Sequence, residues 1–170
     1  MIAKMLGSVL ILAGCGGFGM MICVAFKREE DMLLQLIRAL DFIQCELQYR
    51  MTPLPELCSR AGSACKGRIS QYFQLLAAAL SKRSLPDVRS CAQVAAASAG
   101  KLPERVEKSL EVFSQSLGQF DVQGQIQGLE EARKYCCIAL AEMGENREVR
   151  LRSYQTLGIC AGAALVILLV

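Results

Sequence analysis

Residues 29–54 read EEDMLLQLIRALDFIQCELQYRMTPL, and this stretch decides the fold class. Its apolar side chains recur every three or four residues, which is the spacing of one helical face. They are Met32, Leu33, Leu36, Ile37, Leu40, Ile43 and Leu47. We expect this helix to run as far as Arg50. Thr52 is expected to cap the next helix, with Pro53 in its first turn and Leu54 facing inward. The stretch therefore predicts a helix that ends at a corner, where the chain reverses.

The rest of the middle of the chain shows the same helical period, interrupted by turn signals. A third helix is expected before the turn Ser84–Asp87, and an alanine-rich fourth helix ends at Gly100. A fifth helix opens at Leu102-Pro103 and closes at Gly118, and Asp121 is expected to cap a sixth. The inward residues of these later helices are expected to be Leu57, Cys58, Ala61, Ile69, Tyr72, Phe73, Leu76, Ala79, Leu80, Val106, Leu110, Phe113, Leu117, Ile126, Leu129, Ala132, Cys136, Ala139, Leu140 and Met143. Since no segment sustains period-two alternation, the sequence predicts an all-α antiparallel bundle of about six helices.

Each end of the chain carries a long segment without charge. Met5–Phe26 has 22 residues, which as a helix would span about 33 Å, and Ser153–Val170 has 18, which would span about 27 Å. The first length is enough for a hydrocarbon core of about 30 Å. The second is short but can span with local thinning of the bilayer, and it could instead be a buried core helix. We therefore expect an amino-terminal transmembrane helix in residues 1–26, a helical domain in residues 27–152 and a carboxyl-terminal transmembrane helix in residues 153–170.

Basic residues beside these segments predict the orientation of the chain. The inner flanks of the two segments carry Lys27, Arg28, Arg147, Arg150 and Arg152, whereas only Lys4 lies outside them. Because lysine and arginine accumulate on the cytoplasmic side, the helical domain is expected to face the cytosol of a multi-pass protein in the cell membrane.

Small residues could bring the two predicted spans together. Gly158 and Gly162 form a G-x-x-x-G face in the second span, and Gly16 and Gly19 could pack against it from the first. Ala13 and Gly17 offer an alternative face, and glycine is also simply frequent in membrane helices.

The composition argues against several functional classes. The chain has no His, which removes the commonest general base and a common zinc ligand. Its net charge of +3 is scattered, whereas nucleic-acid binding calls for a clustered basic face. The nine Cys include no C-x-x-C pair, which suits reduced thiols in the cytosol. We expect no enzyme activity, no metal or other cofactor, no small-molecule substrate and no nucleic acid.

Three short motifs in the middle have simple structural interpretations. Ser63–Lys66 matches S-x-x-K but lacks the companion motifs of the enzymes that use it. Of the adjacent Cys136 and Cys137, the first is expected to pack inside and the second to point outward. Glu29–Asp31 and Glu130–Glu131 are expected to be solvated charges near the first turns of their helices, rather than metal ligands.

The amino terminus allows two further interpretations. Gly14–Gly19 matches G-x-G-x-x-G, but the helical spacing after it does not fit a dinucleotide-binding fold. Leu12–Cys15 resembles a lipoprotein cleavage box, which would make the chain an exported lipoprotein lipidated at Cys15. Against this, apolar sequence continues from Gly16 to Phe26, where a polar tether would be expected.

Several motifs along the whole length resemble those of one family. They are Arg38-Ala39-Leu40, Glu46, Tyr49-Arg50-Met51-Thr52-Pro53-Leu54, Leu117-Gly118 with Asp121, Leu157-Gly158, Gly162 and Leu165-Val166-Ile167-Leu168-Leu169. With these residues the chain resembles the stage III sporulation protein AB family of endospore-forming bacteria. The Thr-Pro-Leu corner and the carboxyl-terminal tail are its most specific parts.

The resemblance implies a role in a multiprotein, secretion-like apparatus in the membranes between mother cell and forespore. Members of the family look like the cytoplasmic helical domain of the F-type platform proteins of type II secretion. By that analogy the chain is a noncatalytic platform whose helical domain engages a secretion-type ATPase in the mother-cell cytosol and joins it to membrane proteins of the complex. Six residues would form a structural corner or a partner surface: Arg38, Glu46, Tyr49, Thr52, Pro53 and Leu54. The rival functions are the exported lipoprotein and a membrane-attached enzyme with a cysteine nucleophile.

Overall fold

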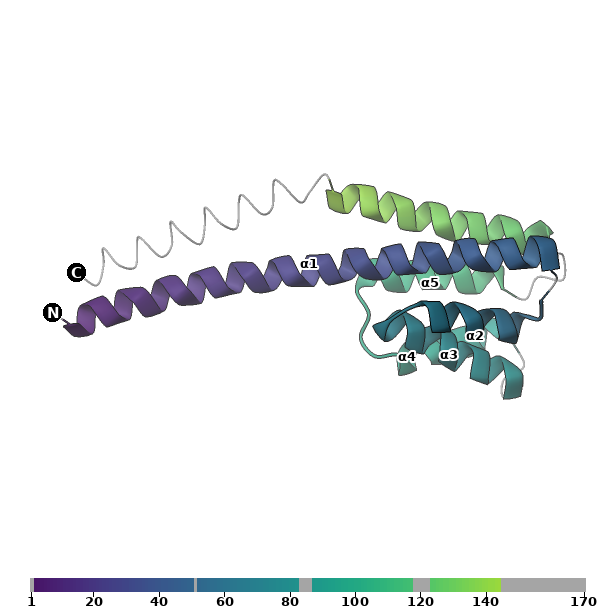
Figure 1. Ribbon diagram of the computed structural model, residues 1–170, viewed down its shortest axis with the longest axis horizontal. Helices are drawn as coiled ribbons and strands as arrows, with labels where there is room; N and C mark the ends of the chain where they lie inside the picture. Colours follow the sequence, from purple (N-terminus) through teal and green to yellow (C-terminus); the bar gives the residue numbers. More distant parts are fainter. Residues whose placement is uncertain (1, 51, 83–86, 118–122, 145–170) are drawn as a thin grey trace. The chain divides into compact units, whose positions relative to one another are not determined.

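The computed structural model describes the backbone of residues 2–50, 52–82, 87–117 and 123–144. Within these ranges it describes the side chain of Met21 and all side chains from Val24 onward. Every regular element in these ranges is a helix (Figure 1). The helices are α1 (Ile2–Arg50), α2 (Leu54–Ala64), α3 (Gly67–Lys82), α4 (Val88–Ser98), α5 (Glu104–Ser116) and a sixth over residues 123–144. The predicted all-α helical bundle is confirmed for this part of the chain.

The chain divides into two compact units. One is Glu29–Leu140, which contains the helical bundle, and the other joins Met1–Arg28 with Ala141–Val170. Within the described residues the second unit consists of helical backbone. The helices α2 to α5 lie wholly in the unit Glu29–Leu140.

The predicted membrane segments lie largely beyond what the structure describes. In the described part of the chain, no helix has both the length and the hydropathy that crossing a membrane requires. Ser153–Val170, with Gly158 and Gly162, lies outside the described residues, as do most side chains of Met5–Phe26. The backbone of Met5–Phe26 is helical within α1, but the packing of Gly16 and Gly19 is not described.

The second half of α1 forms one wall of the bundle, as its apolar period predicts. Its buried side chains are Leu33, Leu36, Ala39, Leu40, Ile43 and Leu47. The sixth helix runs antiparallel to this half of α1 (Figure 1). Arg133 Nε lies 2.6 Å from Asp41 Oδ1, and Gln44 Nε2 donates to Glu130 Oε1 at 3.0 Å. From Asp41 to Gln44 the chain advances three residues on α1, and from Arg133 to Glu130 it goes back three residues on the sixth helix. These paired contacts are those of two antiparallel helices.

Aromatic side chains form the centre of the core. The ring centroids of Tyr72 and Phe73 on α3 are 5.3 Å apart, and those of Phe73 and Phe113 on α5 are 5.7 Å apart, both edge to face. All three side chains are completely buried. Edge-to-face pairs add about 0.5–1.5 kcal/mol beyond the area they bury, so this cluster ties α3 to α5.

The expected inward residues of the later helices are mostly buried. Leu129, Ala132, Cys136, Ala139 and Met143 are buried on the sixth helix, whereas Ile126 and Leu140 are half-buried. On α3, Ala79 and Leu80 are also half-buried, and Ala77 is buried instead.

Two glycines sit where a helix begins or ends. Gly100 has φ +87° directly after α4, and Gly67 has φ +61° at the start of α3. Both are left-handed conformations that a residue with a β-carbon adopts at a cost. Gly100 therefore ends α4 as predicted, whereas the predicted turn residues 84–86 and the predicted caps Gly118 and Asp121 lie outside the described residues.

Candidate functional site

The corner between α1 and α2 is built on the carbonyl of Pro53. This oxygen accepts hydrogen bonds from the backbone N–H groups of Glu56 at 3.0 Å and Leu57 at 3.1 Å, and α2 begins at Leu54. Pro53 occupies the N-cap position with φ −58° and ψ 138°, and a second proline, Pro55, lies in the first turn. Because proline is favoured at a helix start, these two residues fix where α2 begins.

The predicted cap at Thr52 is wrong. No side chain caps α2, and the Thr52 hydroxyl instead donates to Glu46 Oε2 at 3.2 Å. Thr52 lies one residue before the N-cap position, which Pro53 holds, and its hydroxyl donates to a charged acceptor, the Glu46 carboxylate. Thr52 therefore ties the end of α1 to the corner rather than capping the next helix.

Glu46 is the centre of the corner. Its side chain is only 14% exposed, and its carboxylate lies 3.6 Å from Arg50 Nη1 and 3.9 Å from Arg60 Nη1. Arg60 Nη2 also lies 2.6 Å from Glu56 Oε1. A carboxylate withdrawn from water needs such compensation from donors and cations. We call Glu46, Arg50, Thr52, Glu56 and Arg60 the Glu46 cluster.

Beside the Glu46 cluster lies an exposed aromatic side chain. Tyr49 is 78% exposed at the last turn of α1, three residues after Glu46. Pro53 is exposed and Leu54 is half-buried, so Leu54 is not the core residue that the sequence predicted. Exposed tyrosine is typical of protein-binding surfaces, because it offers a large apolar area and a hydroxyl at low entropic cost.

The structure shows a contact between two of the six predicted corner residues. Glu46 and Thr52 are in contact, and Tyr49, Pro53 and Leu54 are their near neighbours along the chain. Arg38 lies eight residues before Glu46, about 12 Å along the helix axis, and outside the Glu46 cluster. Sequence reasoning missed Glu56 and Arg60, whose i, i+4 spacing on α2 was the available signal.

The carboxylates examined as possible metal ligands instead contact other helices. Glu29 Oε1 lies 3.5 Å from Arg105 Nη1 on α5, and its side chain is 16% exposed. Since Glu29 lies in the middle of α1, its expected place in a first turn was wrong. Within the described ranges, no group of three or more Cys, Asp or Glu side chains could hold a metal ion.

Burial suppresses the reactivity of several thiols. It raises the pKa of Cys58 to about 12, and it also raises the pKa values of Cys65 and Cys136. A Ser109 side-chain hydrogen bond opposes the shift at Cys136. Because the thiolate is the nucleophile, these three groups are poor ones. Cys136 is buried and Cys137 exposed, as their positions on one helix predicted.

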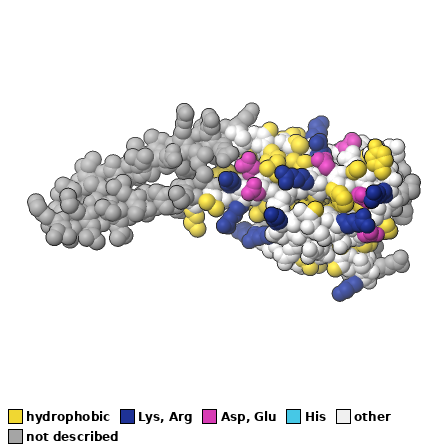
Figure 2. All heavy atoms as spheres, viewed as in Figure 1, with side chains coloured by type: hydrophobic (Ala, Val, Ile, Leu, Met, Phe, Trp, Pro, Cys, Tyr) yellow, Lys and Arg dark blue, Asp and Glu magenta, His cyan; other side chains and the backbone are white. Residues whose placement is uncertain are grey.

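Surface charges of both signs surround these features. On the face shown in Figure 2, basic and acidic side chains are interspersed, with apolar side chains between them. This face therefore presents mixed charge rather than a field of one sign.

Comparison with known proteins identifies the family. The family model described as Stage III sporulation protein AB matches residues 4–170. The chain belongs to this family. A solved structure titled "Stage III sporulation protein AB (SpoIIIAB)" has a similar fold, with a TM-score of 0.62 and 19% sequence identity over 69% of this chain and 94% of that chain. No curated protein sequence matches the chain.

Membership of the stage III sporulation protein AB family confirms the resemblance inferred from the sequence. It supports a component of a sporulation complex. The similarity to the SpoIIIAB structure is one of fold.

Proposed function

We propose that the chain is a noncatalytic platform that joins a cytosolic, secretion-type ATPase to membrane proteins of a sporulation complex. The observation that carries this proposal is the family match across residues 4–170, which covers both predicted membrane segments as well as the bundle. In this proposal Met5–Phe26 and Ser153–Val170 span the membrane, packed through Gly16, Gly19, Gly158 and Gly162. The excess of basic residues on their inner flanks supports a bundle that faces the mother-cell cytosol.

The corner is the proposed contact surface for the ATPase. Glu46 on α1 contacts Thr52, which lies between α1 and α2, and Arg60, which lies on α2. These two contacts fix the end of α1 against the start of α2. Tyr49 and Arg50, 78% and 68% exposed, lie beside this support. An exposed aromatic with an adjacent arginine on a rigid base has the composition of an interface hot spot. Arg38 extends the surface along α1.

Buried thiols support the noncatalytic part of the proposal over a cysteine enzyme. Cys58 and Cys136 have pKa values raised by burial, and the chain has no His to act as their base. The exported lipoprotein makes a separate prediction, since it requires processing at Cys15 and places the bundle outside the cytosol.

Co-purification of the ATPase tests the corner. The full chain, tagged and solubilised from sporulating cells, is compared with Tyr49→Ala and with Ile138→Ala as a matched control. Ile138 is a half-exposed apolar residue on the sixth helix, away from the corner. We expect Tyr49→Ala to release the ATPase and Ile138→Ala to retain it, with both variants as abundant as wild type. Equal retention by both variants would contradict the proposed surface.

A further inference from the structure

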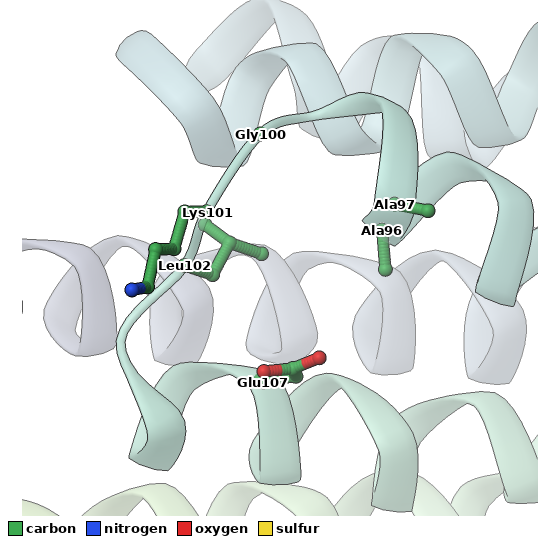
Figure 3. A pocket seen from close by; sticks show the side chains of 6 residues that line it. All are labelled: Ala96, Ala97, Gly100, Lys101, Leu102 and Glu107. Carbon is green, nitrogen blue, oxygen red and sulfur yellow. The ribbon is translucent and has the colours of Figure 1, made fainter.

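A groove separates α4 from α5. It consists of two adjoining depressions of about 280 and 260 Å³, which share Ala96, Ala97 and Glu107. Figure 3 shows the first, where the Ala96 side chain points from α4 toward Glu107 on α5, and Leu102 lies in the connection between them. We call the two depressions together the α4–α5 groove.

The groove exists because α4 is rich in alanine. Ala92, Ala96 and Ala97 line it from α4, and their methyl groups do not fill the space that larger side chains would occupy. Leu102 and Leu110 add apolar lining from the connection and from α5. At these volumes, each depression lies near or below the ~300–1,000 Å³ of most small-molecule pockets. The space suits side chains of a partner better than a cofactor.

Tyr72 gives the groove an unsatisfied polar group. Its side chain is completely buried and lines the second depression, and its hydroxyl has no hydrogen-bond partner among the described residues. A buried tyrosine hydroxyl is normally paired, because leaving it unpaired costs free energy. Burial, and to a smaller extent the Cys58 thiol, raises the pKa of Tyr72, so the hydroxyl stays neutral. Because the oxygen is withdrawn from the surface, a ligand in the groove pairs it only when a lining side chain moves aside.

The charged rim of the groove favours a cation. Glu107 and Glu111 lie one turn apart on α5 and line the groove, and neither forms an ion pair within the described residues. By contrast, Glu104 on the same helix lies 2.7 Å from Lys108 Nζ. Lys101 lines only the first depression, so the second has carboxylates and no basic side chain.

From this geometry we propose that the α4–α5 groove docks a basic segment of another protein in the complex. A lysine or arginine of that segment lies between Glu107 and Glu111, donates to the Tyr72 hydroxyl, and rests its aliphatic stem on Ala96 and Leu110. Anionic lipid is disfavoured by the same two carboxylates. This site is separate from the corner, so loss of the ATPase contact at Tyr49 would leave it intact.

Cross-linking in sporulating cells tests the groove. A photoreactive phenylalanine analogue replaces Ala97, an exposed residue of the groove, in the full chain, and Ala78 on α3 is the exposed control position. We expect Ala97, but not Ala78, to give an adduct with a lysine- or arginine-containing segment of another protein. The combined Glu107→Gln and Glu111→Gln variant should lower the yield about tenfold. Glu131→Gln, an exposed carboxylate on the sixth helix, should leave it unchanged.

Two further variants separate binding from folding. Tyr72→Phe removes a hydroxyl that has no internal partner, so the bundle should be as stable as wild type while the adduct yield falls a few-fold. Glu107→Lys should abolish the adduct, and changing the mapped basic residue of the partner to Glu should restore it. Absence of an adduct at Ala97 would overturn the proposal. An adduct with lipid, with a second copy of this chain or with a segment lacking basic residues would also overturn it. The same holds if the adduct yield is unchanged when Glu107 and Glu111 are both replaced by Gln.

Discussion

Gly128 on the sixth helix lies directly against Ser116 at the end of α5. A β-carbon at Gly128 would overlap the β-carbon of Ser116, a buried residue whose hydroxyl donates to the Phe113 carbonyl at 2.7 Å. At this point the backbones of α5 and the sixth helix approach too closely to admit a side chain at Gly128.

Gly128→Ala is therefore expected to destabilise the bundle by about 1–3 kcal/mol, because the backbone must move to admit the methyl group. Gly144→Ala is the control, since nothing lies within 4 Å of a β-carbon there. The control should be neutral or more stable by up to ~1 kcal/mol, because alanine is the better helix former. Denaturant unfolding of the full chain in detergent measures both. Equal stability of the two variants would show that the helices do not approach closely at Gly128.

Substitutions at Thr52 distinguish a hydrogen bond to Glu46 from a helix cap. If Thr52 capped α2, Thr52→Asp would preserve or improve the cap. Because Thr52 instead donates to the Glu46 carboxylate, we expect Thr52→Asp to remove the donor, add a like charge and lower the melting temperature. Thr52→Ser keeps the hydroxyl and should change stability by less than about 0.5 kcal/mol. A Thr52→Asp protein more stable than wild type would restore the capping interpretation.

Cys58 should make the bundle sensitive to alkali. Burial raises the pKa of the Cys58 thiol to about 12 in the folded state, whereas the pKa of an unfolded thiol is ~8.5. Between these two pH values the folded state keeps the thiol proton and the unfolded state loses it. This contribution to stability is fully present below about pH 8.5 and is lost as the pH rises toward 12. Denaturant midpoints between pH 7 and 10 should fall more steeply for wild type than for Cys58→Ala. Parallel pH profiles would indicate that Cys58 titrates normally.

The helices were predictable because their determinants are local. The apolar period of Met32–Leu47 places the second half of α1 correctly, Gly100 marks the end of α4, and Leu102-Pro103 marks the start of α5. Each of these signals depends on residues within a few positions of one another.

The contacts of the candidate sites were not predictable, because they join residues far apart in the sequence. Arg60 reaches Glu46 only once α2 folds back along α1, and no spacing rule indicates that the Tyr72 hydroxyl is buried without a partner. The Thr52 prediction failed because α2 starts one residue later than expected, with Pro53 rather than Thr52 at the N-cap position.

Labelling of exposed thiols tests the orientation of the bundle. Cys45 and Cys137 are exposed in the fold, so a bundle that faces the cytosol keeps them from a membrane-impermeant maleimide only while the membrane is intact. We expect no reaction in intact cells and rapid reaction after permeabilisation. Buried Cys91 should react only on denaturation, which controls for unfolding. Labelling of Cys45 in intact cells, together with processing at Cys15, would favour the exported lipoprotein.

The distribution of the ATPase between membrane and soluble fractions tests the platform most directly. In sporulating cells with the wild-type chain, the secretion-type ATPase should sediment with the membranes, and it should do so equally with Ile138→Ala. With Tyr49→Ala at matched abundance it should move to the soluble fraction. The account would be contradicted if the ATPase stayed with the membranes when the chain is deleted, or if Tyr49→Ala left its distribution unchanged.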